Sequence, residues 1–171
     1  YRKLDENNFF EVTSTKSLLR KNNNGPDAFF FTFAINPQKI LPSCSIAHRK
    51  ARELYSDQGQ TATYYQRLLK GTRVTKIAKY ISDDNGLPFV NNILLSYRGD
   101  INYDLDRLEN YYDGSKLKIH DTPGMFHVID GQHRLFSYSP ELHPEGLDDD
   151  EEIIVTVIDG IDIKKESELF V

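Results

Sequence analysis

The stretch "GMFHVIDGQHRLFSYS", Gly124 to Ser139, joins two apolar segments of different period. The first segment runs from Met125 to Ile129 without interruption and stops abruptly at an Asp-Gly pair. A short continuous apolar run bounded by turn residues is typical of a buried strand. The residues after the Asp-Gly pair read as a short helix that ends before Pro140. The stretch therefore predicts a core strand that leads directly into a helix.

The rest of the chain alternates between strand and helix patterns. We expect strands at 28–36, 93–97 and 152–159, and a β-hairpin over 116–129 because a turn sequence separates two strand-like runs. We expect helices at 42–59, 61–71, 72–86 and 163–171, from apolar residues at helical spacing and from serine and glycine boundary signals. This interleaving favours an α/β fold in which an α+β mixed sheet is flanked by short helices.

The length of 171 residues predicts a single domain over 1–171. Within it we expect residues 1–27 to form a peripheral N-terminal segment and residues 98–115 to form an insertion. Because the chain begins at Tyr1 without an initiator methionine, we interpret it as an excised part of a longer protein.

Composition narrows the class of protein. The net charge is −5, and acidic residues concentrate at 145–152, so the composition neither favours nor excludes DNA as a partner. The single cysteine, Cys44, excludes an intramolecular disulfide framework and a multi-cysteine zinc site. No apolar run reaches the roughly 20 residues that a membrane-spanning helix needs. We therefore expect no membrane partner and a cytoplasmic location.

Five polar or conformationally special residues occupy the expected strand-to-helix junction, Asp130-Gly131-Gln132-His133-Arg134. The first N–H groups of a helix lack partners within the helix and carry partial positive charge, so a phosphate or carboxylate is favoured there. Gly131 lets a ligand approach the backbone closely, and Arg134 supplies a forked cation. The junction is therefore a candidate anion site.

The other three residues of the junction have several roles open to them. Asp130 suits a helix cap, a metal ligand or a group that orients its neighbours. Gln132 can donate and accept hydrogen bonds, and His133 can donate to phosphate or act as an acid or base near neutral pH. An ordinary turn followed by a solvated helical turn explains the same residues about as well. Residue chemistry alone leaves both interpretations open.

Further candidates are less distinctive. Arg67 with Gln66, on an expected helix, could supply a second cation for phosphate or could be an ordinary surface pair. Asn91 and Asn92 could contact a ligand, although a turn before the next strand is slightly favoured. Arg49 lies on the polar side of a helix, where most such residues are simply solvated.

Residues 129–135, "IDGQHRL", match the signature of the DGQHR-domain family, whose best known members are the DndB-type regulators of DNA phosphorothioation. The chain resembles that family in further blocks and in the same order: "FTFAINPQKILP", "YYQRLLKGTRVTKIAKYI", "LPFVNNILLSY" and "IIVTVIDGIDIKKESELF". The resemblance covers roughly residue 28 to residue 171. A more remote similarity links it to the ParB/sulfiredoxin-like fold, where a Gly-x-x-Arg turn binds nucleotide phosphates.

The resemblance implies a nucleotide-handling site in a bacterial DNA-modification or phage-defence system. We expect an NTPase that uses Mg²⁺ with ATP or another NTP, in which Gly131, Arg134, Gln66 and Arg67 hold phosphates. Asp130 would hold Mg²⁺, and His133 or Gln132 would position the attacking water. The alternative is a non-catalytic DNA-binding transcriptional regulator. Expected partners are a nucleotide, DNA, other DNA-modification or defence proteins, and a second copy of the chain.

Overall fold

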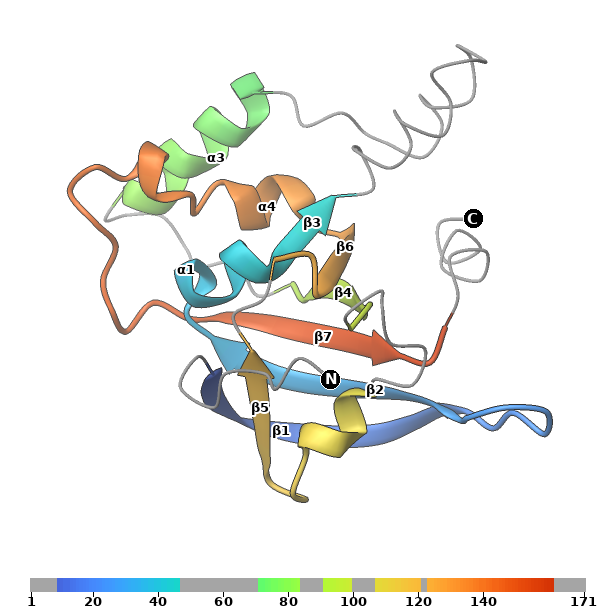
Figure 1. Cartoon of the computed structure of the whole chain (residues 1–171). Coiled ribbons are helices and arrows are strands. Elements are labelled where there is room, and N and C mark those ends of the chain that lie inside the picture. Colours follow the sequence, from blue (N-terminus) through green and yellow to red (C-terminus); the bar gives the residue numbers. More distant parts are fainter. Residues whose placement is uncertain (1–8, 47–70, 84–90, 100–106, 121–122, 162–171) are drawn as a thin grey trace, which may run out of the picture.

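The computed structural model describes residues 9–46, 71–83, 91–99, 107–120 and 123–161, and its centre is a curled seven-stranded mixed sheet (Figure 1). The strands are β1 (Phe9–Arg20), β2 (Ala28–Ile35), β3 (Cys44–Ile46), β4 (Ile93–Tyr97), β5 (Lys116–His120), β6 (Phe126–Asp130) and β7 (Ile153–Asp159). The helices are α1 (Pro37–Ile40), α3 (Gly71–Ser82) and α4 (Gln132–Phe136), with 3₁₀ turns at η1 (Leu41–Ser43), η2 (Leu108–Tyr111) and η3 (Pro140–Leu142). The predicted mixed α+β class is confirmed.

The strand order is β3-β6-β4-β7-β2-β1-β5, with β7 in the middle. β7 runs parallel to β4 and antiparallel to β2, and β6 pairs with β3 in parallel and with β4 antiparallel. The sheet curls so far that its two edges approach each other. Ser43, just before β3, donates from Oγ to the carbonyl oxygen of His120 at the end of β5, over 3.3 Å.

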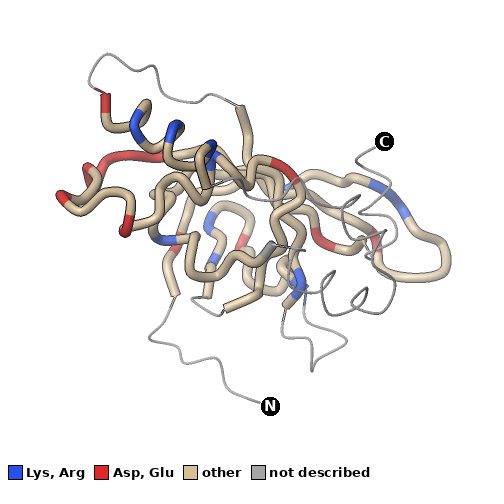
Figure 2. Tube along the Cα trace, turned by 90° about the horizontal axis from the view of Figure 1, so that it is seen from above, with Lys and Arg blue, Asp and Glu red and all other residues tan. Residues whose placement is uncertain are grey.

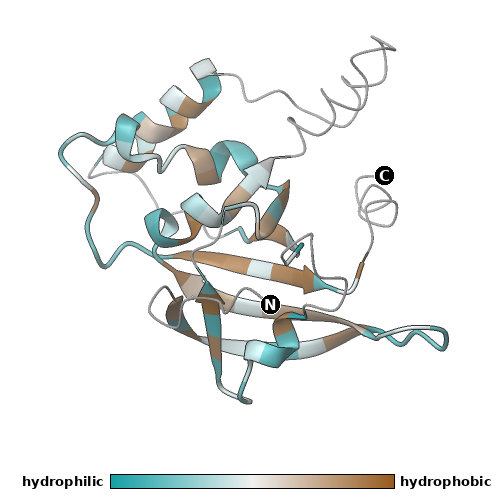
Figure 3. Cartoon of the chain, in the orientation of Figure 1, coloured by the Kyte–Doolittle hydropathy of each residue, from teal (hydrophilic) through white to brown (hydrophobic). Residues whose placement is uncertain are grey.

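The core lies on one face of this sheet because apolar residues alternate along its strands. Phe31 pairs with Val157, and Phe33 pairs with Val155, and all four side chains are buried. Figure 3 shows the apolar residues of the sheet and the hydrophilic connection between β1 and β2. On the opposite face the hydroxyl groups of Thr32 and Thr156 lie 3.2 Å apart. The alternation explains why 28–36, 93–97 and 152–159 were predictable as strands.

The predicted hairpin over 116–129 is wrong. β5 pairs with β1, whereas β6 pairs with β3 and β4 at the other side of the sheet. Turn chemistry between two strands indicates only that the chain bends there, while the partner of each strand is decided by burial of its apolar face. Leu117 and Ile119 of β5 are fully buried opposite Val12 and Phe10 of β1.

Other expectations also need correction. Residues 9–20 of the segment expected to be peripheral form β1, which lies between β2 and β5 in the sheet. Leu108, in the region expected to be an insertion, is buried in the core, and the insertion itself stays a prediction. Cys44–Ile46, expected to begin a helix, form β3.

Helix α3 confirms the helix predicted at 72–86. The predicted helices at 61–71 and 163–171 lie outside the described residues, except for Gly71, which is the first residue of α3. Among the helices that the structure describes, none combines the length and the apolar character required to span a bilayer.

Candidate functional site

The strand-to-helix junction predicted from sequence is present. β6 ends at the exposed Asp130, Gly131 has φ 88°, and α4 begins at Gln132. A Cβ on Gly131 would lie 2.7 Å from Cδ1 of Ile93 and 3.0 Å from Nη2 of Arg134. Glycine is therefore required here both by the left-handed backbone and by the space that neighbouring side chains occupy.

The guanidinium of Arg134 folds back over this glycine. Its Nη1 donates to the carbonyl oxygen of Asn91 at 2.8 Å, and its Nη2 donates to that of Asn92 at 3.3 Å. The Asn92 side chain donates in turn to Oγ1 of Thr156 on β7, at 2.9 Å. The structure thus brings Gly131, Arg134, Asn91 and Asn92 together, and the two asparagines serve the junction through their backbone carbonyls.

The three side chains predicted to act on a ligand differ in exposure. Asp130 is exposed, Gln132 is half-buried, and His133 is only 8% exposed. Arg134 forms no ion pair with any other described residue, so its positive charge is not offset by a carboxylate in that part of the chain. The described residues contain no group of three or more His, Cys, Asp or Glu that could hold a metal ion. A cation at Asp130 would therefore depend on water and on the ligand for most of its coordination.

Three of the predicted site residues belong to the segment between β3 and α3. Arg49, Gln66 and Arg67 lie outside the residues that the structure describes. Whether a second cation faces the junction stays a prediction.

Sequence reasoning missed the exposed face of α3. Arg73, Lys76 and Lys79 are exposed and three residues apart, which places them side by side on the helix surface. The helix contains no Asp or Glu, and none of the three cations forms an ion pair with another described residue. Figure 2 shows the three basic positions along α3. Their spacing could have been read from the sequence, because the apolar residues already fixed the buried side of the helix.

Sequence reasoning also missed a buried ion pair at the end of β7. Arg107 donates from Nε to Oδ2 of Asp159 at 3.0 Å, and the N–H of Leu108 donates to the same oxygen at 2.9 Å. Nη2 of Arg107 donates to the carbonyl oxygen of Asp27 at 2.6 Å. Burial raises the pKa of Asp159, and the adjacent Arg107 opposes that rise. We call this group of Arg107, Asp159 and the Asp27 carbonyl the clasp.

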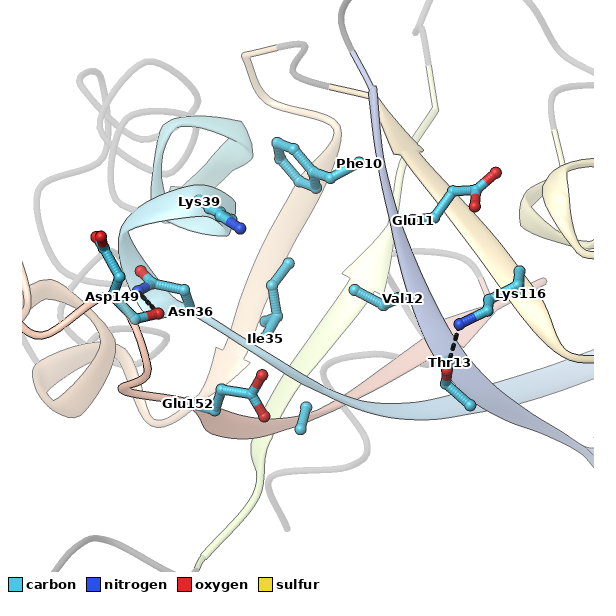
Figure 4. A pocket seen from close by; sticks show the side chains of 11 residues that line it. Phe10, Glu11, Val12, Thr13, Ile35, Asn36, Lys39, Lys116, Asp149 and Glu152 are labelled. Carbon is cyan, nitrogen blue, oxygen red and sulfur yellow. Dashed lines mark hydrogen bonds between the residues drawn. The ribbon is translucent and has the colours of Figure 1, made fainter.

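A hollow of about 360 Å³ lies at the end of β2, beside β1 and α1 (Figure 4). Its wall carries both signs of charge, and the Asn36 side chain donates across it to the carbonyl oxygen of Asp149 at 3.3 Å. The lining residues are Phe10, Glu11, Val12, Thr13, Ala34, Ile35, Asn36, Lys39, Lys116, Asp149 and Glu152. None of them belongs to the junction, so the hollow and the junction are separate features.

Comparison with known proteins identifies the family. A family model described as DndB, DNA-sulfur modification-associated, matches residues 31–171, which include the junction, α3 and β7. A search of curated proteins returned no match, and a search of solved structures returned none. The matched region spans most of the chain and carries the "DGQHR" junction whose geometry is described above. The chain therefore belongs to the DndB family, which is associated with DNA-sulfur modification.

Proposed function

We propose that this chain is a DNA-binding regulator of a DNA-sulfur modification system and that it contacts the phosphate backbone through α3. The observation that carries the proposal is the exposed row of Arg73, Lys76 and Lys79 on a helix without acidic residues, in a chain of net charge −5. Cations that are not neutralised by neighbouring carboxylates are available for phosphate, and phosphate contacts supply most sequence-independent affinity for DNA.

The row suits a duplex backbone better than a single small anion. Three cations spaced along one face of a helix can each neutralise a different phosphate, whereas a small ligand would need them to converge. The acidic loop 145–152 lies at the same end of the domain as α3, so it would weaken binding to DNA at low salt (Figures 1 and 2).

The proposal is tested with a fluorescent mixed-sequence duplex and a variant that combines Arg73→Ala, Lys76→Ala and Lys79→Ala. Loss of three phosphate contacts should weaken binding at low salt roughly tenfold or more, and should reduce the slope of log K against log salt by about 3. The side chains are exposed, so the thermal unfolding midpoint should stay close to the wild-type value.

A matched control removes the same number of cations elsewhere, through Lys39→Ala, Lys116→Ala and Lys118→Ala. This control should keep the wild-type slope. Equal slopes for the wild type and the α3 variant would overturn the proposal. A parallel variant with Asp149→Asn and Asp150→Asn in the acidic loop should bind DNA more tightly at low salt and no differently at high salt.

A second candidate function is nucleotide binding and hydrolysis at the strand-to-helix junction. The observation that favours it is that the junction carries both an exposed carboxylate, Asp130, and the Arg134 guanidinium, which forms no ion pair with any described carboxylate. Under this proposal Arg134 and the backbone at Gly131 hold phosphates, and Asp130 binds Mg²⁺ through water. Gln132 is the better placed of the two candidates to orient water, because His133 is buried.

Calorimetry with ATP, CTP and GTP in the presence of Mg²⁺ tests this second function, on the wild type and on Arg134→Ala. Binding by the wild type that is lost in Arg134→Ala and kept in Arg134→Lys would support it. Phosphate release is then measured on the wild type and on Asp130→Asn. A folded wild-type protein that binds no nucleotide of the panel would exclude it.

A further inference from the structure

The end of β1 and its connection to β2 form an arm, residues 18–27, in which residues 21–27 are a loop and Arg20 pairs with Ala28; the arm extends past the end of β7 (Figure 1). Two leucines at its base, Leu18 and Leu19, are 47% and 45% exposed. The register shifts between Leu18 and Arg20, so the strand bulges at Leu19. The family match begins at residue 31, which means that the arm lies outside the matched region. It is therefore an element that the family assignment does not explain.

The tip of the arm is polar, and its turn is fixed by its own hydrogen bonds. The N–H of Asn22 donates to Oδ1 of Asp27 at 2.9 Å, and the N–H of Asn24 donates to Oδ1 of Asn22 at 3.2 Å. These bonds use the one carboxylate of the arm to hold the turn. Arg20 and Lys21 follow the leucines and are exposed, as is Asn23. Figure 2 shows this basic stretch on the protruding loop.

The clasp fixes the base of the arm to the sheet. Arg107 donates to the Asp27 carbonyl, where the arm returns to β2, and its Nε is held by Asp159. A Cβ on Gly160 would lie 3.0 Å from Cα of Ala28, so the chain after β7 packs directly against the same point. An arm that is anchored in this way loses little conformational entropy when it binds a partner.

We propose that the arm enters the major groove of duplex DNA and supplies sequence readout. The major groove, about 12 Å wide, admits a two-stranded antiparallel ribbon, and the arm is the closed end of the antiparallel β1–β2 pair. The exposed side chains match the chemistry of base edges there: Arg pairs with guanine, Asn pairs with adenine, and apolar groups contact the thymine methyl. The inference rests on the proposed function in that its ligand is DNA, but it uses a surface at the opposite end of the domain from α3 (Figures 1 and 2).

Charge favours a polyanion over a second copy of the chain as the occupant. Two adjacent cations, Arg20 and Lys21, would face the same pair on another copy if two arms met symmetrically, and like charges repel. A DNA groove instead presents phosphates on both sides of an inserted arm, and thymine methyl groups can contact Leu18 and Leu19.

The test selects binding sites from a random-sequence duplex pool with the full chain and with a variant carrying Arg20→Ala, Lys21→Ala and Asn23→Ala. The wild type should enrich a defined sequence, and the variant should bind that sequence roughly tenfold more weakly while keeping its affinity for unselected duplex within about threefold. Replacing thymine by uracil in the selected site should weaken the wild type and leave Leu19→Ser unaffected. All substituted side chains are exposed, and circular dichroism checks that each variant is folded.

The outcomes separate the two proposals. If the arm variant enriches the same sequence with the same affinity as the wild type, the readout proposal is overturned and the α3 proposal stands. If the arm variant loses affinity equally for all sequences, the arm contacts only phosphates and readout is again overturned. If the arm variant changes the oligomeric state in light scattering without changing DNA binding, the arm belongs to an interface between copies. If α3 substitutions have no effect while arm substitutions change the enriched sequence, the α3 proposal fails and the readout proposal stands.

Discussion

Two arginine–glycine pairs lie along β7, one linked through Asn92 to Thr156 at its middle and one at its C-terminal end, and they use the same geometry for different purposes. At the junction, Arg134 lies over Gly131 and donates to the carbonyl groups of Asn91 and Asn92. In the clasp, Arg107 lies over Gly160 and donates to the carbonyl of Asp27. Each glycine has a positive φ, and each leaves the space into which the guanidinium folds.

The difference between the two pairs is the carboxylate. Arg107 is largely buried and is paired with the buried Asp159, so its charge is neutralised inside the fold. Arg134 satisfies part of its donor capacity with neutral carbonyls and keeps its full charge near the surface. The clasp is consequently a structural element, whereas the junction has a cation available for an anionic ligand.

The largest effect should come from removing the carboxylate of the clasp. Asp159→Ala leaves Arg107 charged, buried and without its partner, which typically costs about 3–5 kcal/mol of unfolding free energy. Asp159→Asn keeps a hydrogen-bonding group and should cost less. Urea denaturation measures both, with the exposed Asp130→Ala as the control that stays near the wild type. If Asp159→Ala lowered the free energy of unfolding only slightly, Arg107 would be no more structural than Arg134.

The two glycines should rank next. A non-glycine residue in such a backbone region costs about 1–3 kcal/mol. Gly160→Ala should lie at the upper end, because its Cβ meets the Ala28 Cα and the Asp27 carbonyl, which are backbone atoms that cannot move aside. Gly131→Ala should lie at the lower end, because its nearest neighbour is the end of the Ile93 side chain.

A double variant checks that explanation. Ile93→Val removes Cδ1, so the cost of Gly131→Ala should be smaller in the Ile93→Val background than in the wild type. Additive costs would show that the backbone conformation alone, and not the contact with Ile93, limits position 131.

Arg134→Ala should have a smaller effect on stability, about 1 kcal/mol, because its two hydrogen bonds are to neutral carbonyls at an exposed site. Arg134→Lys should recover only part of the lost stability, since an ammonium cannot reach both carbonyl oxygens in the way that the planar guanidinium does. Thermal unfolding of the pair gives the comparison. A loss as large as that of Asp159→Ala would mean that the junction is as structural as the clasp.

The smallest effect concerns pH. Burial raises the pKa of Asp159 in the folded protein, so the folded state binds this proton more readily than the unfolded chain does. The stability contributed at this residue should therefore rise as pH falls through the window between the unfolded and folded pKa values, and should be lost as pH rises. Relative to Asp159→Asn, the wild type should gain stability as pH falls from above the raised folded-state pKa toward the ordinary pKa of an aspartate. The opposite slope would indicate that Arg107 outweighs burial.

Local patterns in the sequence predicted the elements whose burial follows a simple period. The alternating residues of β2 and β7, the apolar spacing of α3 and the strand-to-helix junction were all readable in this way. The pairing of β5 with β1 was not predictable, because the apolar pattern of a strand shows that one of its faces is buried but not which strand it pairs with. β3 has only three residues and carries too few positions to show a period.

Only the part of the site that is local in the sequence was predictable. Asp130 to Arg134 are consecutive, so their chemistry could be read together. The contact of Arg134 with Asn91 and Asn92 joins residues 42 and 43 positions apart, and the ion pair of Arg107 with Asp159 joins residues 52 apart. Such contacts follow from the strand order, which local periodicity does not contain.

The central position of β7 has a consequence for how the chain is made. β7 is the last described strand in sequence, yet it alone joins β3-β6-β4 to β2-β1-β5 within the sheet. Before β7 is synthesised, β4 and β2 therefore lack the strand that joins them, and each would be an open edge that can pair wrongly. The seven-stranded sheet can be completed only after β7 has been synthesised and inserts between β4 and β2.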